Sequence, residues 1–244
     1  ASALTGVITD PRELLMDYPR IKDPEFPSLN RGVLEPPLAF KKAVSIKLRK
    51  VDNIVSFPQF DQMPNSLKIP VLLKANHDLS TDEILPAGPQ FSPYRSNILK
   101  SSEFVFARVD TSYPERASKL KSQGGHIVVG GQNYGQGSSR EHAALAPRFL
   151  GLRIIIAISF GRIHWQNLIN SGVLPLVFKD QSDYQKIEQN DLLEFSDLRN
   201  KMSQVKEIEV FNTTKGRTFL TEHKLSDRQI EILLAGGIVN WAKE

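Results

Sequence analysis

The sequence predicts a mixed α/β domain that follows an extended, proline-rich segment. Between about residues 126 and 178, short β-branched runs alternate with helical segments, which is the pattern of strands joined by crossover helices in a covered, largely parallel sheet. The runs after residue 190 are typical of antiparallel, half-solvated strands. We expect residues 1–40 to form an extended linker or strap and residues 41–244 to form the folded domain.

The composition is that of an ordinary globular protein with room for a sizeable core. The chain has 244 residues, of which 40% are hydrophobic and 24% are charged. No apolar run approaches the length of a membrane span, and the first residues lack the basic and apolar regions of a signal peptide. The net charge of +4 is spread along the chain, and the pI is about 9.2. These values suit an anionic small molecule at least as well as nucleic acid.

The elements before the centre of the chain are predicted from prolines and from period-two patterns. The prolines of the linker are Pro11, Pro19, Pro24, Pro27, Pro36 and Pro37. A brief helix is expected at 11–18, and a longer one at 113–123 that Gly124 and Gly125 close. Strands are expected at 43–49, 71–75 and 103–109.

A glycine-rich turn lies at the centre of the chain. The β-branched run 126–129 predicts a buried strand, and glycines at 130, 131, 135 and 137 follow it. Ser138 and Glu141 have the spacing of a capping box, so we expect a helix at 139–150 that begins just after Ser138.

The remaining elements follow in alternation. Strands are expected at 153–158, 173–178, 192–195, 207–211 and 217–220. Ser159 is expected to cap a helix that ends near Gly172. Ser226 with Gln229 predicts a final capped helix, which Gly236 and Gly237 stop.

The central turn is predicted to bind an anion. Free amide groups and the positive end of the helix dipole would face a ligand above the loop. Arg140, in the first turn, opposes that dipole, so a bidentate clamp on a carboxylate or phosphate explains it better than helix stability does. The spacing is neither that of a Walker loop nor that of a nucleophile elbow.

Three ordered motifs carry a family resemblance. They are Ser80–Gly88 followed by Arg95, Asn133–Arg148, and Ser159–Leu168 followed by Gly172–Leu176. Together they resemble the C-terminal swivel domain of the aconitase family. The resemblance implies a swivelling β/β/α fold for residues 41–244 and chemistry on citrate, cis-aconitate and isocitrate.

The resemblance also implies roles for particular residues. Ser138 stands at the position of the catalytic base, which acts as an alkoxide that amide groups, the helix end and an arginine stabilise. Arg95 and Arg140 match ligands of the substrate carboxylates, and Ser139 would add a hydrogen bond. Asp82 is expected to assist catalysis by orienting Ser138 or an arginine.

Two positions depart from the family pattern. Glu83 stands where members often have histidine, and Gln132 stands where many have aspartate. Neither change removes a charged substrate ligand, but both alter the expected hydrogen bonding around the site.

The iron–sulfur chemistry of the family cannot reside in this chain alone. Aconitases hold a [4Fe-4S] cluster through three cysteines of other domains, and this chain has no cysteine. Its five histidines are not spaced as a ligand set, so we expect no metal ligated by this chain. The chain begins at Ala1 rather than Met, so we expect a segment of a longer polypeptide or a separate subunit, inactive in isolation.

Three functions are carried forward. The first is part of an aconitate hydratase in the cytoplasm, or in the mitochondrial matrix if the source is eukaryotic, with cluster-bearing domains or a large subunit as partner. The second is the small subunit of an isopropylmalate or homoaconitate isomerase, for which the loop of Arg95 is the discriminating feature. The third, of another class, is an RNA-binding iron regulatory relative, to which the dispersed basic residues give little support.

Overall fold

The computed structural model describes residues 1–17, 20–23, 32, 35–47, 49–51 and 53–243. They fall into two compact units, Ala1–Arg49 and Lys50–Glu244. Among the described residues of the first unit, short helices are α1 (Ser2–Thr5), the 3-10 helix η1 (Pro11–Leu14) and α2 (Phe40–Ala43).

The strand predicted at 43–49 is wrong for its described residues, and residue 48 lies outside them. The chain forms α2 instead and then turns, with the amide of Val44 bonded to the carbonyl of Phe40 at 3.1 Å. A strand must pair its backbone groups, and no strand is described within Ala1–Arg49 that could pair with it. The helix expected at 11–18 is one turn, η1, and residue 18 lies outside the described residues. Residues 24–31 also lie outside the described residues, so the extended linker stays a prediction.

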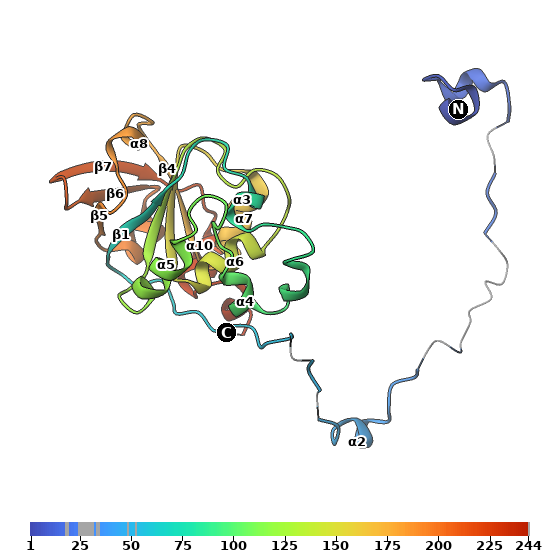
Figure 1. Ribbon diagram of the computed structural model, residues 1–244, viewed down its shortest axis with the longest axis horizontal. Coiled ribbons are helices and arrows are strands. Elements are labelled where there is room, and N and C mark those ends of the chain that lie inside the picture. Colours follow the sequence, from blue (N-terminus) through green and yellow to red (C-terminus); the bar gives the residue numbers. More distant parts are fainter. Residues whose placement is uncertain (18–19, 24–31, 33–34, 48, 52, 244) are drawn as a thin grey trace. The chain divides into compact units, whose positions relative to one another are not determined.

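The second unit is built on a closed barrel with the strand order β1-β2-β3-β4-β7-β6-β5 (Figure 1). Its strands are β1 (Leu67–Lys74), β2 (His126–Gly130), β3 (Leu152–Ala157), β4 (Leu174–Phe178), β5 (Leu192–Phe195), β6 (Glu207–Asn212) and β7 (Arg217–Glu222). Strands β1 to β4 pair in parallel, and the other pairs are antiparallel. This confirms the mixed α/β fold, with a parallel part followed by an antiparallel part.

Helices connect and flank the strands of this barrel. They are α3 (Thr81–Ile84), η3 (Ser92–Tyr94), α4 (Ile98–Ser102), α5 (Tyr113–Lys121), α6 (His142–Phe149), α7 (Arg162–Asn170), α8 (Asp183–Lys186), α9 (Leu198–Gln204), α10 (Asp227–Leu234) and α11 (Ile238–Trp241). The capping box predicted for α10 is confirmed, since the amide of Ser226 donates to Oε1 of Gln229 at 2.9 Å. Within the described part of the chain, every helix is too short or too polar to cross a lipid bilayer.

The parallel strands are buried on both faces, which explains their near-continuous apolar sequences. Ile127 and Val129 of β2 belong to one cluster of the core, and Val128 belongs to a second cluster. The second cluster also contains residues of α3, α4 and α6, which lie on the opposite side of the barrel from β5, β6 and β7 (Figure 1). One side of the barrel is thus covered by helices.

The strand predicted at 103–109 is also wrong. These residues form successive turns after α4, and Phe106 has a φ of 55°. Val105 and Phe106 are fully buried, and the amide of Phe106 bonds to the carbonyl of Ile84 at 2.8 Å. The alternation of apolar residues therefore reflects a turn that inserts its side chains into the core.

Candidate active site

The site lies where the parallel strands β1, β2 and β3 end. In open and closed parallel sheets, ligands bind beyond the carboxyl ends of the strands, where connecting loops converge. Here the loops are tied together: Tyr134 pairs with Phe160, and Ser80 pairs with Gln136. The amide of Thr81 also donates to the carbonyl of Gln136 at 2.8 Å. The loop after β1 therefore meets the glycine-rich turn.

Gly135 allows the turn to pack closely on α7. It has a φ of +75°, and a Cβ atom built at this position would overlap the ring of His164. His164 is 2% exposed, and burial lowers its pKa to about 4. The imidazole of His164 is therefore neutral, and the turn packs against it at Gly135.

Ser138 is not the cap of the following helix, so the predicted capping box with Glu141 is wrong. Helix α6 begins at His142, its N-cap is Glu141, and no side chain caps it. The carbonyl of Ser138 instead accepts hydrogen bonds from Oγ1 of Thr81 at 3.2 Å and from the amide of Arg140 at 2.9 Å. The turn stays irregular up to α6 because its backbone is bonded to α3.

A cavity of about 330 Å³ gathers four of the five predicted site residues. Ser138, Ser139, Arg140 and Arg95 all line it. The rest of the lining consists of Leu85, Pro86, Ala87, Phe91, Ser101, Glu141 and His142. No hydrogen bond to Oγ of Ser138 is formed by the described residues, which leaves this hydroxyl available to a ligand.

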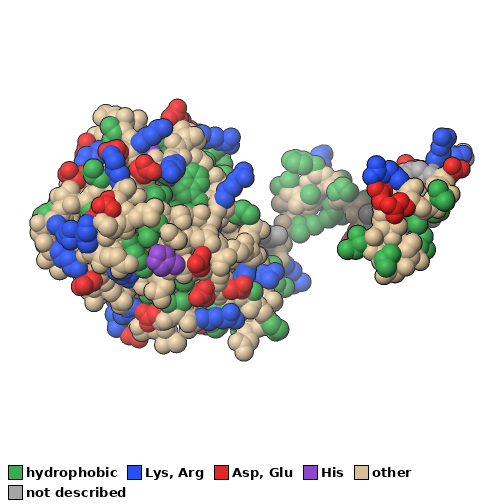
Figure 2. All heavy atoms as spheres, turned by 90° about the horizontal axis from the view of Figure 1, so that it is seen from above, with side chains coloured by type: hydrophobic (Ala, Val, Ile, Leu, Met, Phe, Trp, Pro, Cys, Tyr) green, Lys and Arg blue, Asp and Glu red, His purple; other side chains and the backbone are tan. Residues whose placement is uncertain are grey.

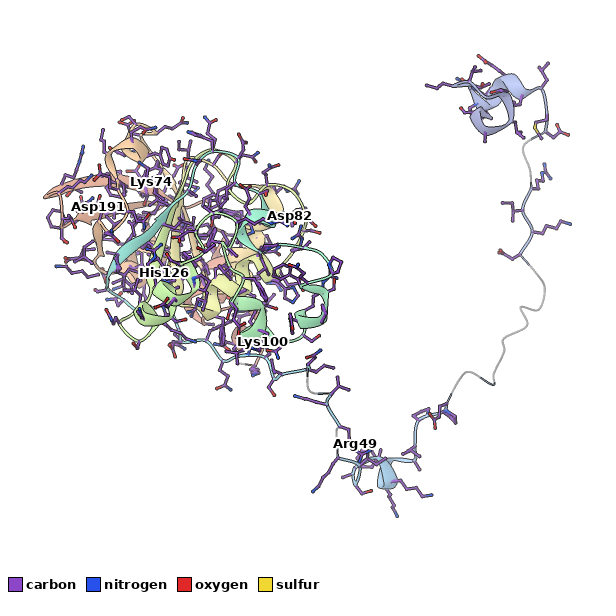
Figure 3. All side chains as sticks on the ribbon, viewed as in Figure 1. Arg49, Lys74, Asp82, Lys100, His126 and Asp191 are labelled. Carbon is purple, nitrogen blue, oxygen red and sulfur yellow. The ribbon has the colours of Figure 1, made fainter. Side chains whose placement is uncertain are left out.

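The fifth residue, Asp82, lies beside the cavity and holds Arg140. Oδ1 of Asp82 is 2.8 Å from Nη2 of Arg140, and Nη1 of the same guanidinium donates to the carbonyl of Leu85 at 2.9 Å. The hydrogen bond from Arg140 lowers the pKa of Asp82 below its ordinary value. In the view of Figure 3, Asp82 lies to the right of Lys74 and Asp191. Asp82 therefore orients an arginine, one of its two expected partners.

Arg95 is positioned through its backbone. Its carbonyl oxygen lies 2.8 Å from Nε2 of His142, the first residue of α6. The next carbonyl along the chain, that of Ser96, accepts a hydrogen bond from the amide of Val55 at 3.1 Å. The side chain of Arg95 is exposed, but the backbone of its loop is bonded to His142 and to Val55.

Two guanidinium groups stand at the cavity and can bind carboxylates. They are those of Arg95 and Arg140, and Arg140 is paired with Asp82. The carboxylate of Glu141 also lines the cavity, and its side chain is 68% exposed. Arginine side chains are common ligands of carboxylates, so these two guanidinium groups can contact carboxylates of a ligand in this cavity.

Of the two departures from the family pattern, Glu83 has a role for its side chain, whereas Gln132 contributes through its backbone. Glu83 completes a capping box at the start of α3: its Oε2 accepts from the amide of Ser80 at 2.8 Å and from the hydroxyl of Ser80 at 2.7 Å. The amide of Gln132 donates to Nδ1 of His77 at 3.0 Å. Neither residue lines the cavity.

Sequence reasoning missed three residues that build the site. Thr81 holds the backbone of Ser138, His142 holds the loop of Arg95, and His164 supports Gly135. All three lie within the family motifs, but no pattern in the sequence gave them these individual roles. Among the described residues, no group of three or more histidine, cysteine, aspartate or glutamate side chains could hold a metal ion.

Comparisons with known proteins agree with this geometry. A sequence model of the family described as "Aconitase C-terminal domain" matches residues 99–181. The chain is 34% identical over 210 residues to a mitochondrial aconitate hydratase of Gracilaria gracilis, covering 77% of this chain and 26% of that protein. It is 37% identical over 199 residues to a mitochondrial homocitrate dehydratase of Saccharomyces cerevisiae, covering 72% and 25%. The chain spans about a quarter of the length of these curated relatives.

One solved structure matches this chain over nearly the whole length of that structure. The crystal structure of 3-isopropylmalate dehydratase from Methanocaldococcus jannaschii has a TM-score of 0.59 and 31% sequence identity, and the match covers 73% of this chain and 93% of that one. This likeness agrees with the match to the family model and with the identities to the curated relatives, and on these grounds the chain belongs to the aconitase C-terminal domain family.

Proposed function

We propose that this chain supplies the serine base and the carboxylate-binding arginines of a hydro-lyase that interconverts citrate and isocitrate through cis-aconitate. The observation that carries the proposal is the shared cavity of Ser138, Ser139, Arg95 and Arg140. These side chains come from two loops that are distant in sequence, and the ties between the strand ends bring them together. The relatives named as aconitate hydratases support this reaction class.

Each residue has a distinct task in the proposed reaction. Arg95 and Arg140 bind carboxylates, and Ser139 donates a hydrogen bond to one of them. Oγ of Ser138 removes a proton from a carbon next to a carboxylate, and returns it in the reverse direction. A serine hydroxyl is a weak acid, so its deprotonated form needs the positive charge of the arginines in a site closed to water.

The chain's own residues do not fit an iron–sulfur cluster. It has no cysteine, and the described residues contain no group of side chains that could bind a metal. We propose that separate domains or a separate subunit hold the [4Fe-4S] cluster, which supplies a Lewis acid for the substrate hydroxyl. The isolated chain is accordingly proposed to be inactive. As an intracellular enzyme part it would act in the cytoplasm, or in the mitochondrial matrix in a eukaryote.

A second candidate is the corresponding part of an isopropylmalate or homoaconitate isomerase. The likeness to the archaeal 3-isopropylmalate dehydratase and to the yeast homocitrate dehydratase favours it. An RNA-binding role gains no such support. On the larger body in Figure 2, acidic and basic side chains are intermixed, and the visible face has no continuous basic tract.

A substrate comparison tests the proposal. The chain would be combined with a cluster-bearing partner, and the hydration of cis-aconitate, of isopropylmaleate and of homoaconitate would be measured side by side. We expect cis-aconitate to give the highest kcat/KM, and Arg95→Lys to lower it more than Lys100→Gln, a control on the neighbouring helix α4. Preference for isopropylmaleate would replace the first candidate by the second, and no turnover of any of the three acids would reject both.

A further inference from the structure

A second cavity, of about 390 Å³, has a cationic lining and shares no residue with the candidate active site. It lies between the segment 58–61 and the ends of helices α5 and α6. Its cations are Lys121 of α5, Arg148 of α6 and Arg153 of β3, and its one carboxylate is that of Asp61. The motifs that identified the family give this cluster no role.

Two of these cations are removed from water. Arg148 is 4% exposed, and the side chain of Arg153 is 11% exposed. No described residue accepts a hydrogen bond from Nε of Arg148 or from Nε and Nη1 of Arg153. Burial, followed by the neighbouring charge of Arg153, lowers the pKa of Arg148 to about 9. Buried charges are normally paired, so these two guanidinium groups require a counterion.

Asp61 is a weak counterion for this cluster. Its Oδ2 is 3.4 Å from Nη2 of Arg153, and its side chain is 89% exposed, so water screens it. Lys121 and Arg148 also stand in the last turns of their helices, where cations complement the partial negative charge. That charge is about half a unit for each helix. Three full positive charges therefore leave about one unbalanced after Asp61 and both helix ends are counted.

Aromatic rings fix two of the cations at the cavity. The guanidinium of Arg148 lies 4.8 Å from the ring centre of Phe60, and Nζ of Lys121 lies 4.0 Å from that of Phe149. Nη2 of Arg148 also donates to the carbonyl of Asp61 at 2.9 Å, which anchors the segment 58–61 as one wall. The cationic groups are thus held in place before any ligand arrives.

We propose that this second cavity binds a compact oxyanion with two or more negative charges, a phosphate or a polycarboxylate. Such an anion replaces the exposed carboxylate of Asp61 beside Arg153 and meets Lys121 at the rim. Guanidinium forks suit both oxyanions equally well, so the experiment distinguishes them. The inference does not depend on the proposed function.

The test is a calorimetric titration of the 244-residue chain with inorganic pyrophosphate and, in a separate experiment, with citrate. Citrate is also measured on Arg95→Gln, because the active-site cavity is a second place for it. We expect at least one of the two anions to bind saturably, and we expect Arg95→Gln to leave this binding unchanged. Lys121→Gln should weaken this binding about tenfold, the worth of one charge-assisted hydrogen bond. Asp61→Asn should strengthen it.

Matched variants keep the result interpretable. Lys121 and Asp61 are exposed, so their substitution spares the fold, which circular dichroism would verify, whereas Arg148 supports a wall of the cavity. Lys119→Gln, two residues earlier on α5 and paired with Glu115, should leave the affinity unchanged. The proposal is overturned if neither anion saturates, or if Lys121→Gln and Asp61→Asn bind as the parent does.

Discussion

Nη2 of Arg140 lies 2.8 Å from Oδ1 of Asp82, and this ion pair joins the loop after β1 to the loop after β2. Both residues were predicted to belong to the site from sequence motifs about sixty positions apart. The pair fixes the direction of the guanidinium, while Ser138 and Ser139 occupy the same cavity. We therefore propose that Asp82 acts on substrate through Arg140.

Asp82→Asn should reduce substrate binding more than stability. The side chains of the pair are 22% and 49% exposed, so the loss of folding free energy should stay below about 1 kcal/mol. In the assembled enzyme KM should rise about tenfold, because the orientation of Arg140 is lost. Urea unfolding and steady-state kinetics measure the two effects. Equal KM values for Asp82→Asn and for the control Glu115→Gln would refute this role.

His142 should act as a positioning residue for Arg95. His142→Ala removes the hydrogen bond to the carbonyl of Arg95, so KM should rise several-fold with a smaller change in kcat. His142→Gln keeps a donor and should restore most of the loss. If His142→Gln and His142→Ala change KM and kcat by the same factors, the hydrogen bond does not position the loop.

Gly135→Ala should be far more damaging than Gly216→Ala. Both glycines have positive φ, +75° and +61°, so each alanine pays about 1 kcal/mol of backbone strain. Only the Cβ at Gly135 would also overlap His164, which should raise the total to about 2 to 4 kcal/mol. Chemical denaturation of the two variants gives the comparison. Similar losses of unfolding free energy would show that the turn tolerates the side chain.

The buried pair of Tyr113 and His126 should make stability fall in acid. Nε2 of His126 lies 2.7 Å from the hydroxyl of Tyr113, and burial, aided by the charge of Arg116, lowers the pKa of His126 to about 3. Since the unfolded value is 6.5, the unfolded chain binds the extra proton between pH 6.5 and about 3. Stability is therefore full above pH 6.5 and drops by up to about 1.4 kcal/mol per pH unit below it.

Urea unfolding at pH 7, 6 and 5 checks this slope. His126→Leu removes the titrating group, so its unfolding free energy should depend less on pH than that of the parent chain. Tyr113→Phe keeps the histidine and should retain the slope, while it lowers stability by about 1 to 3 kcal/mol, because the imidazole loses its partner. Parallel pH profiles for His126→Leu and the parent would count against the assignment.

The sequence predicted the parallel strands and their helices well, because strands such as 126–129 are buried on both faces and bounded by glycines. It failed at 43–49 and 103–109, where apolar alternation has other causes: a short isolated helix and a buried turn. The closing of the barrel depends on pairing between β1 and β5, which no local pattern records. The capping box at Ser138 failed because Thr81, distant in sequence, binds the carbonyl that precedes the helix.

For the site, the motifs identified the residues that line the cavity but not those that support it. Arg95 was predicted from its place after Ser80–Gly88, whereas the part of His142 in holding it depends on a contact across 47 positions. The second cationic cavity escaped prediction for the same reason. Its cations come from α5, α6 and β3, and each alone resembles an ordinary surface charge or helix-end charge.

Single-turnover kinetics of Ser138→Ala in the assembled enzyme would test the central claim most directly. We expect proton removal from citrate to slow by at least about a thousandfold, while citrate still binds within a few-fold of the parent affinity, because Arg95 and Arg140 remain in place. Proton removal at the parent rate would contradict the assignment of Ser138 as the base.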